Sequence, residues 1–280
     1  MVESGSGSEA GHDRNRPVAW VTGASRGMGA NIALEFARKG YDLAITARDQ
    51  QRLDRIKKEA SALGADVLAL CTDLTDRKTL ETFAEAALAH FGRCDVLCNV
   101  GVYQGPGGKQ LIMDTALDEL AISFEADVIG PVLLCQRAIP AMLAAGSGTI
   151  VNMSSSSVVM VPPGTVEGSG WSFAYVAAKA GIDRLASIIN VELGDKGIRA
   201  FNVEPGFVAY GERFATALRK YPGIPVSPPQ AIGPAVLWLV READAGRLLD
   251  KRVNLPGLTH KFGLLAGWNG PGTNFEAEQA

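Results

Sequence analysis

The stretch PVAWVTGASRGMG, residues 17–29, is the part of the sequence that most clearly predicts the fold. A β-rich apolar run from Pro17 to Thr22 leads into three glycines, and Met28, Ile32 and Phe36 then follow at helical spacing. Glycines between a strand and a helix allow a tight turn and let the backbone approach a pyrophosphate closely. The free N–H groups at the start of the helix favour the same anion. The stretch therefore predicts a dinucleotide-binding strand–turn–helix unit, with a purely structural turn as the alternative.

Strand-like and helical patterns alternate along the rest of the chain. Further strands are expected at residues 42–47, 67–71, 95–99, 149–153, 198–203 and 252–255, and helices at residues 28–39, 50–63, 77–91, 117–145, 174–193 and 228–241. This alternation predicts a single α/β domain of the Rossmann type, a doubly wound parallel sheet of about seven strands with helices on both faces. We expect residues 1–16 to be a disordered leader, residues 17–267 to form the domain and residues 268–280 to be a loose C-terminal tail.

The overall charge argues against partners that carry many phosphates. The 280 residues include 27 Lys and Arg against 30 Asp and Glu, a net charge of -3, so bulk charge attracts neither nucleic acid nor an anionic membrane. The apolar run from Ile122 to Leu143 is interrupted by Glu125, Asp127 and Arg137, and it falls short of the roughly 18 uncharged residues of a membrane span. We therefore expect no nucleic-acid partner, no membrane partner and a cytoplasmic location.

The cysteines and histidines do not indicate a metal or redox site. Cys71, Cys94, Cys98 and Cys135 lie in apolar surroundings, which is typical of buried, reduced thiols. Cys94 and Cys98 are too far apart for a CxxC motif, and no histidine clusters with them, so no metal is expected. Residues 1–16 lack an apolar core, unlike a signal peptide.

Two arginines near the glycine-rich turn favour a phosphorylated dinucleotide. Folds that bind NAD commonly place an acidic residue after the second strand for the ribose hydroxyls, whereas here Arg48 follows Ala47. Arg26 in the turn supplies a second guanidinium, and the two together could bind a 2′-phosphate. NADP(H) is therefore expected over NAD(H), with ordinary surface arginines as the alternative. Asp73 could accept from the adenine amino group or cap a helix.

Tyr175 and Lys179 form the motif with the clearest chemical use. Positions i and i+4 share one face of a helix, and an ammonium group beside a phenol favours the phenolate form. Such a tyrosine can protonate a developing alkoxide or deprotonate an alcohol. Residues 154–157 are four consecutive serines at the end of the fifth strand, where a hydroxyl could donate to a substrate oxygen. A Tyr-x-x-x-Lys pair alone is common on surface helices, and its place after the fifth strand favours catalysis.

These motifs, in this order, resemble the short-chain dehydrogenase/reductase family over residues 17–257. The resemblance implies an oxidoreductase that transfers hydride between a nicotinamide and a carbonyl or secondary alcohol, and most members are homotetramers or dimers. It implies that Ser155 polarises the carbonyl, Tyr175 is the acid/base and Lys179 holds the nicotinamide ribose. The residues that it assigns to the cofactor are Gly23, Ser25, Arg26, Gly27, Met28, Gly29, Arg48, Asp73, Leu74, Asn99, Gly101, Tyr175, Lys179, Pro205, Gly206 and Val208.

Some positions depart from the family's pattern. The family has a catalytic asparagine in the long helix before the fifth strand, and that position is Asp127 here. We expect the carboxylate to retain the role of the asparagine, with a modest change in activity. Cys98 and Val100 replace an asparagine and an alanine, and Tyr210 stands near a frequent threonine.

Two loops rich in glycine or proline are expected to border the substrate. Residues 102–110 and 161–170 both follow strands, and ligands of open α/β sheets bind beyond the carboxyl ends of strands. The catalytic serine and tyrosine are 20 positions apart (175 − 155), wider than the family usually shows, and the extra residues fall in the second loop. Trp171 and Phe173 nearby suit an apolar or aromatic substrate, with solvated surface loops as the alternative.

The sequence leaves two classes of function open. The favoured one is an NADP(H)-dependent oxidoreductase acting on a small carbonyl or alcohol. An NADP(H)-binding regulatory protein with weak or lost catalysis is the alternative, and Asp127 is the feature that favours it. Related epimerases and dehydratases usually show TGxxGxxG, whereas residues 22–29 follow TGxxxGxG.

Overall fold

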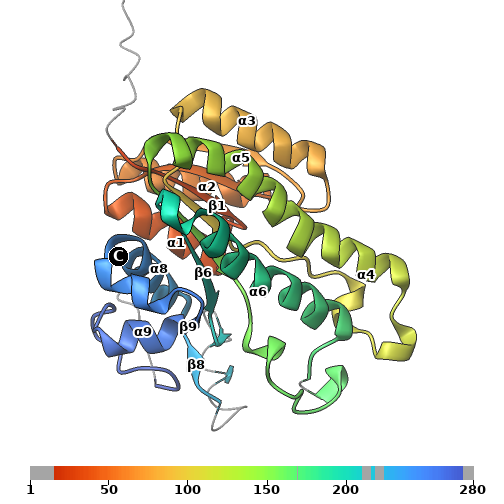
Figure 1. The fold of residues 1–280 in the computed structure, drawn as a ribbon. Coiled ribbons are helices and arrows are strands. Elements are labelled where there is room, and N and C mark those ends of the chain that lie inside the picture. Colours follow the sequence, from red (N-terminus) through yellow and green to blue (C-terminus); the bar gives the residue numbers. More distant parts are fainter. Residues whose placement is uncertain (1–15, 169, 210–215, 218–223, 274–280) are drawn as a thin grey trace, which may run out of the picture.

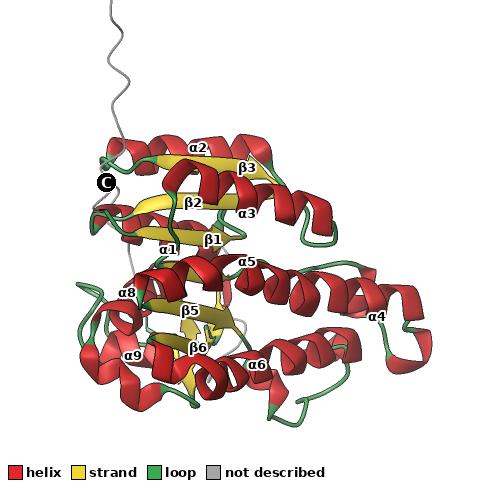
Figure 2. Ribbon diagram, turned by 45° about the horizontal axis from the view of Figure 1, so that its top comes forward, coloured by secondary structure: helices red, strands yellow, loops and turns green. Residues whose placement is uncertain are grey.

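Strands with apolar residues on both faces form the centre of the molecule. The computed structural model describes residues 16–168, 170–209, 216–217 and 224–273. In this part of the chain, seven parallel strands make one sheet in the order β3-β2-β1-β4-β5-β6-β9 (Figure 2), which confirms the predicted fold class. The strands are β1 (Val18–Thr22), β2 (Asp42–Ala47), β3 (Val67–Cys71), β4 (Val96–Asn99), β5 (Gly148–Met153), β6 (Ile198–Glu204) and β9 (Arg252–Asn254), with a separate parallel pair of β7 (Phe207–Val208) and β8 (Val226–Ser227).

Helices cover both faces because successive strand residues point to opposite sides of the sheet. Ala19 and Val21 belong to one buried core, and Val18 and Trp20 belong to the other. The first core is closed by α1 (Gly27–Arg38), α2 (Gln50–Ala62), α8 (Ile232–Arg241) and α9 (Leu255–Lys261), and the second by α3 (Arg77–Phe91), α5 (Gly130–Ala145) and α6 (Phe173–Leu193) (Figure 1).

The helix predicted over residues 117–145 is continuous but not regular. It consists of α4 (Leu117–Phe124), a π-helical turn (Glu125–Ile129) and α5. A π turn interrupts the helical spacing of side chains, and such turns are frequent at functional sites. Here the π turn carries Asp127.

The same continuous helix is long and apolar enough to cross a membrane, judged by length and composition. Within its most apolar window, 33% of the residues are buried inside the structure. Core helices of soluble proteins meet the same criterion, and in this fold α4 lies against α6 while α5 lies against α3. Length and composition therefore do not separate a membrane span from a packed helix here.

Cys71 corrects one expectation from the sequence. The prediction that the cysteines are buried is correct for Cys94, Cys98 and Cys135, and burial raises the pKa of all three thiols. Cys71 is exposed at the end of β3. Since β3 is the edge strand of the sheet, its last residue has no strand on its outer side.

Trp268 is packed against the domain. It is 6% exposed, and its ring lies edge-on to His260 with the ring centroids 6.5 Å apart. Residues 274–280 of the predicted tail and residues 1–15 of the predicted leader lie outside the described residues.

Candidate active site

A cavity of about 1150 Å³ lies where the order of the strands reverses, between the segments that follow β1 and β4. This is the place where open parallel sheets bind ligands. The cavity is lined by Gly23, Ser25, Arg26, Gly27, Met28, Gly29, Thr46, Ala47, Arg48, Asp49, Arg52, Thr72, Leu74, Val100, Gly101, Val102 and Gln104. The structure thus brings together the glycine-rich turn, Arg48, Leu74 and Gly101, which are far apart in the sequence.

Two glycines of the turn are required because the backbone packs closely against itself there. A Cβ atom on Gly29 would lie 2.3 Å from the carbonyl oxygen of Gly23. A Cβ atom on Gly23, whose φ of 67° is left-handed, would lie 2.8 Å from Cα of Gly101. Thr22 joins the two segments, because its Oγ1 accepts from the N–H groups of Val100 at 2.9 Å and Gly101 at 3.0 Å. Both glycines are therefore required by the packing of the turn, and the turn in this form lines the cavity at the start of α1, where a helix N-terminus favours an anion.

Three arginines line the same cavity. Arg26 and Arg48, which the sequence analysis assigned to the cofactor, are exposed on its wall. Arg52 on α2 was missed, although its spacing of four from Arg48 places both near the start of one helix. Asp49 is the N-cap of α2 and pairs with Arg52 at 3.2 Å. The glycine-lined turn and these guanidinium groups fit the phosphates of a dinucleotide.

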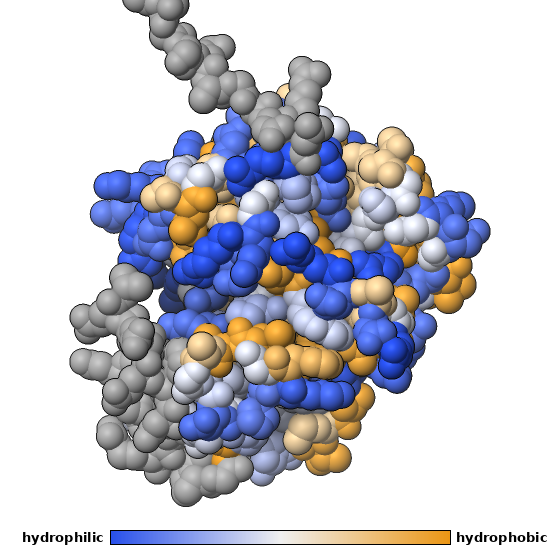
Figure 3. All heavy atoms as spheres, turned by 90° about the vertical axis from the view of Figure 1, so that its left-hand side faces the viewer, coloured by the Kyte–Doolittle hydropathy of each residue, from blue (hydrophilic) through white to orange (hydrophobic). Residues whose placement is uncertain are grey.

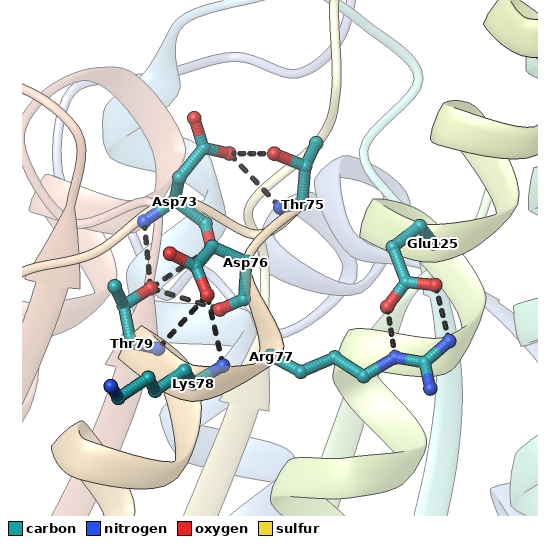
Figure 4. A network of polar contacts seen from close by, with 7 residues as sticks. All are labelled: Asp73, Thr75, Asp76, Arg77, Lys78, Thr79 and Glu125. Carbon is teal, nitrogen blue, oxygen red and sulfur yellow. Dashed lines mark hydrogen bonds and ion pairs between the residues drawn. The ribbon is translucent and has the colours of Figure 1, made fainter.

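Asp73 does not cap α3, so the N-cap alternative is wrong. Its Oδ1 accepts from the N–H and the hydroxyl of Thr75, both at 2.9 Å, while Asp76 caps the helix by accepting from Lys78 N and Thr79 N (Figure 4). The second carboxylate oxygen of Asp73 points away from Thr75 in this view. Asp73 is not among the residues that line the cavity, whereas Leu74 is.

The remaining cofactor residues of the sequence prediction are not among those that line this cavity. Asn99 is buried at the end of β4, and its Nδ2 donates to Asn152 Oδ1 at 2.9 Å. Pro205 and Gly206 form the turn between β6 and β7, and Val208 lies on β7. Tyr210 lies outside the described residues.

Lys179 reaches the end of β5, where the serine cluster begins. It is 5% exposed, and its Nζ donates to the carbonyl oxygen of Met153 at 2.8 Å. Ser155 lies two residues further on, with its hydroxyl accepting from Ser157 N at 3.2 Å. Tyr175 is half-buried one turn before Lys179 on α6, and the helix cap Ser172 accepts from its N–H at 3.2 Å. The structure therefore places the lysine of the pair at Met153, the end of β5, two residues before Ser155.

Asp127 lies in the π turn beside Lys179 and accepts a hydrogen bond from the loop over residues 102–110. It is 3% exposed, and its Oδ1 accepts from the backbone N–H of Tyr103 at 2.8 Å. Burial raises the pKa of the Asp127 carboxyl, while the Lys179 ammonium and the Tyr103 N–H act in the opposite direction. Tyr103, which sequence reasoning did not single out, donates its hydroxyl to Glu119 at 3.2 Å. The loop over residues 102–110 is thus attached to α4 and to the π turn.

A second cavity of about 310 Å³ lies near the start of α6. Both predicted substrate loops contribute to it, Gln110 from the first and Pro162 and Val166 from the second. It is lined by Gln110, Leu111, Ile112, Pro162, Thr165, Val166, Trp171, Ser172, Phe173 and Val176. Most of these side chains are apolar or aromatic.

Comparison with known proteins gives the class to which this fold and site belong. The family model described as short chain dehydrogenase matches residues 17–219. The chain belongs to the short-chain dehydrogenase/reductase family, a family of oxidoreductases.

Relatives of known name support this assignment. The chain is 32% identical over 194 residues to dehydrogenase/reductase SDR family member 7 of Mus musculus, covering 68% of this chain and 54% of that protein. It therefore spans about half the length of that relative. It is 32% identical over 191 residues to the 3-oxoacyl-[acyl-carrier-protein] reductase FabG of Staphylococcus aureus, covering 68% of this chain and 74% of the reductase. A metagenomic short-chain oxidoreductase solved in complex with NADP is similar in structure, with a TM-score of 0.68 and 29% identity over 85% of this chain and 94% of that one.

Proposed function

We propose that this protein is an NADP(H)-dependent oxidoreductase that interconverts a carbonyl group and a secondary alcohol, with Tyr175 as the acid/base. The observation that carries the proposal is the hydrogen bond from Lys179 Nζ to Met153 O, 2.8 Å long. This contact puts the lysine of the Tyr175–Lys179 pair at the strand end that also bears Ser155. These groups and the glycine-lined cavity all follow the carboxyl ends of strands in one parallel sheet, as catalytic and cofactor groups do in this architecture.

Different residues of the chain would bind the cofactor, transfer the proton and stabilise the developing charge. The turn over residues 23–29 and the arginines would hold the phosphates of the cofactor, whose nicotinamide, when bound, supplies or accepts the hydride. The Tyr175 hydroxyl would give its proton to the oxygen of a carbonyl substrate during reduction, and take it back during oxidation. Lys179 would stabilise the phenolate by its charge, and the Ser155 hydroxyl would donate to the substrate oxygen as negative charge develops there.

The arginines favour NADP(H) over NAD(H). Arg26, Arg48 and Arg52 bring three guanidinium groups to the wall of one cavity, while the carboxylate of Asp49 is paired with Arg52. A 2′-phosphate gains charge-assisted hydrogen bonds from such groups, whereas a 2′-hydroxyl gains little.

The second cavity favours a substrate with an apolar or aromatic part. Trp171, Phe173 and Val176 are close to Tyr175 in the sequence and line that cavity from the start of α6. Its volume of about 310 Å³ is at the lower end of the range for small-molecule sites.

Reduction of a panel of ketones, aldehydes and quinones, followed by the loss of NADPH absorbance, tests the proposal. We expect turnover with the wild type and a fall in kcat of about 10²- to 10⁴-fold in Tyr175→Phe, the usual contribution of a general acid/base. NADPH binding, measured by its fluorescence, should change far less than kcat, since Tyr175 is not among the residues that line the cavity of the glycine-rich turn. Full activity in Tyr175→Phe would contradict the mechanism. Tight NADPH binding without turnover across the whole panel would favour the regulatory alternative.

A further inference from the structure

Asp183 lies one turn after Lys179 on α6 and connects three elements. Its carboxylate accepts from Arg252 of β9 twice, from Nε to Oδ1 at 3.1 Å and from Nη2 to Oδ2 at 2.7 Å. The Oδ1 atom also accepts from the hydroxyl of Ser154 at 2.5 Å. The Asp183 and Arg252 side chains are only 17% and 19% exposed. This group, made of Ser154, Asp183 and Arg252, therefore joins the end of β5 to α6 and to the last strand of the sheet.

The register of the sheet explains why these residues meet. Asn202 of β6 stands opposite Asn152 of β5 on one side and opposite Arg252 of β9 on the other. The amide nitrogen of Asn202 donates to the backbone carbonyl of Asp183. Two residues earlier on β5 and β6, Ile150 and Ala200 face the same helix as part of an apolar core. The residues that stand opposite one another nearer the carboxyl ends of these strands, Asn152, Asn202 and Arg252, are polar instead.

Polar contacts constrain α6 in a way that the apolar core does not. Hydrophobic burial is nearly independent of direction, whereas a bidentate pair between a guanidinium and a carboxylate defines both distance and orientation. The group made of Ser154, Asp183 and Arg252 therefore defines how far along the sheet α6 sits, and with it the position of Lys179 one turn away.

Ser154 links this group to the chemistry. It is 2% exposed and stands between Met153, whose carbonyl accepts from Lys179, and Ser155. Its N–H donates to Val203 O of β6 at 2.8 Å, so both its backbone and its side chain are engaged. We propose that Asp183 and Arg252 are positioning residues, which act through Ser154 to hold the lysine contact and Ser155 in the geometry that the reaction needs. This inference rests on the proposed function.

The expected effect on turnover is large because acid/base chemistry depends steeply on geometry. A displacement of about 1 Å at a catalytic group can cost about 10²-fold in rate. Removing Arg252 would leave a carboxylate buried without its partner, and such a change can prevent folding. Ser154→Ala and Asp183→Asn are milder, since the first removes one hydroxyl and the second keeps the shape of the side chain.

The test measures kcat, the affinity for NADPH and the pH dependence of kcat in these two variants and in the double variant. We expect kcat to fall by about 10- to 100-fold and the pH profile to shift, because α6 with its Lys179 ammonium moves relative to Met153 O and Ser155 at the end of β5. NADPH affinity should stay unchanged, since none of the three residues lines the large cavity. The kcat of the double variant should be no lower than that of the more impaired single variant, because both substitutions break the same group of contacts.

Asp95→Asn is the matched control. Arg93 donates to Asp95 twice, from Nε at 2.9 Å and from Nη2 at 2.6 Å, and this pair lies at the amino end of β4, whereas Ser154 follows the carboxyl end of β5. The Asp95→Asn substitution should lower the melting temperature without altering kcat or the pH profile of kcat.

Unchanged kcat and pH profile in Ser154→Ala and Asp183→Asn, in a protein whose turnover depends on Tyr175, would overturn this inference and leave the proposed function intact. An equal loss of kcat in Asp95→Asn would also overturn it, because the effect would then be one of general stability. A wild type without any carbonyl turnover would overturn both.

Discussion

Asp127 is a carboxylate at a position where the family has an asparagine, and its surroundings show what it does. The Oδ1 atom accepts from Tyr103 N, a contact that an asparagine carbonyl can also make. The difference between the two residues is charge. A buried carboxylate loses hydration, while the Lys179 ammonium compensates part of that cost, and the balance raises the pKa of the Asp127 carboxyl.

This balance predicts how Asp127→Asn changes stability with pH. A raised pKa means that the folded protein binds the proton more tightly than the unfolded chain, so this stabilisation is complete below about pH 4 and is lost as the pH rises through the folded pKa. The amide does not titrate. We therefore expect the melting temperature of Asp127→Asn relative to wild type to rise from pH 4 to pH 8. Differential scanning fluorimetry across this range measures the effect. A lower melting temperature of the variant at pH 8 would show that attraction to Lys179 outweighs the cost of burial.

The same variant tests whether aspartate is tolerated in the reaction. If Asp127 retains the role of the asparagine, turnover in Asp127→Asn should change only modestly. A gain of several orders of magnitude in kcat would contradict this expectation and would favour the view that the natural protein is catalytically weak.

At the scale of elements, the junction between β2 and α2 carries the arginines that we propose select the cofactor. β2 ends at Ala47, Arg48 follows on the cavity wall, and Asp49 caps α2 by accepting from Arg52 N at 3.0 Å. The cap and the ion pair from Asp49 together direct Arg52, which also lines the cavity.

We predict that Arg48→Ala and Arg52→Ala each lower kcat/KM for NADPH by about 10- to 100-fold, the worth of a hydrogen bond to a charged group. The values with NADH should hardly change, because the lost partner is the 2′-phosphate. Arg55→Ala is a suitable control, since Arg55 pairs with Glu59 on the same helix and does not line the cavity. Equal losses with both cofactors would show that the arginines serve the shared phosphates instead.

At the scale of the whole molecule, α6 and the neighbouring α4 carry exposed apolar side chains. Leu117 on α4 is 80% exposed, and Ile188 and Val191 on α6 are 48% and 83% exposed. α4 and α6 lie side by side (Figure 1). The face at the left of Figure 1, seen in Figure 3, intermixes hydrophilic and hydrophobic residues. Ile188 and Val191 lie within one turn of each other on α6, and neighbouring exposed apolar side chains are typical of an interface.

We therefore expect a homo-oligomer, a dimer or a tetramer, that buries the faces of α4 and α6. The double substitution Ile188→Glu and Val191→Lys should dissociate it, because charges are costly at the centre of an apolar interface. Light scattering coupled to size-exclusion chromatography measures the mass of each form. A wild type that is monomeric at all concentrations would contradict the expectation.

Much of the fold and part of the site were determined by the sequence alone. A strand buried on both faces must be apolar throughout, so the run from Val18 to Thr22 was recognisable as part of a parallel sheet. Glycine at position 29 is required by the approach of Gly23 O, and this kind of requirement appears in the sequence as a motif. Tyr175 and Lys179 share one helix, where spacing alone determines the face.

The tertiary structure alone decided contacts between residues that are distant in the chain. Asp183 and Arg252 are 69 positions apart, and they meet only because β9 adds to the sheet beside β6. Asp127 meets Tyr103 because a π turn changes the direction of its side chain. Cys71 is exposed because β3 is the edge strand, and strand order is a property of the assembled sheet. Local sequence patterns determine whether a segment forms a helix or a strand. The packing of these segments against one another determines which distant polar side chains come into contact.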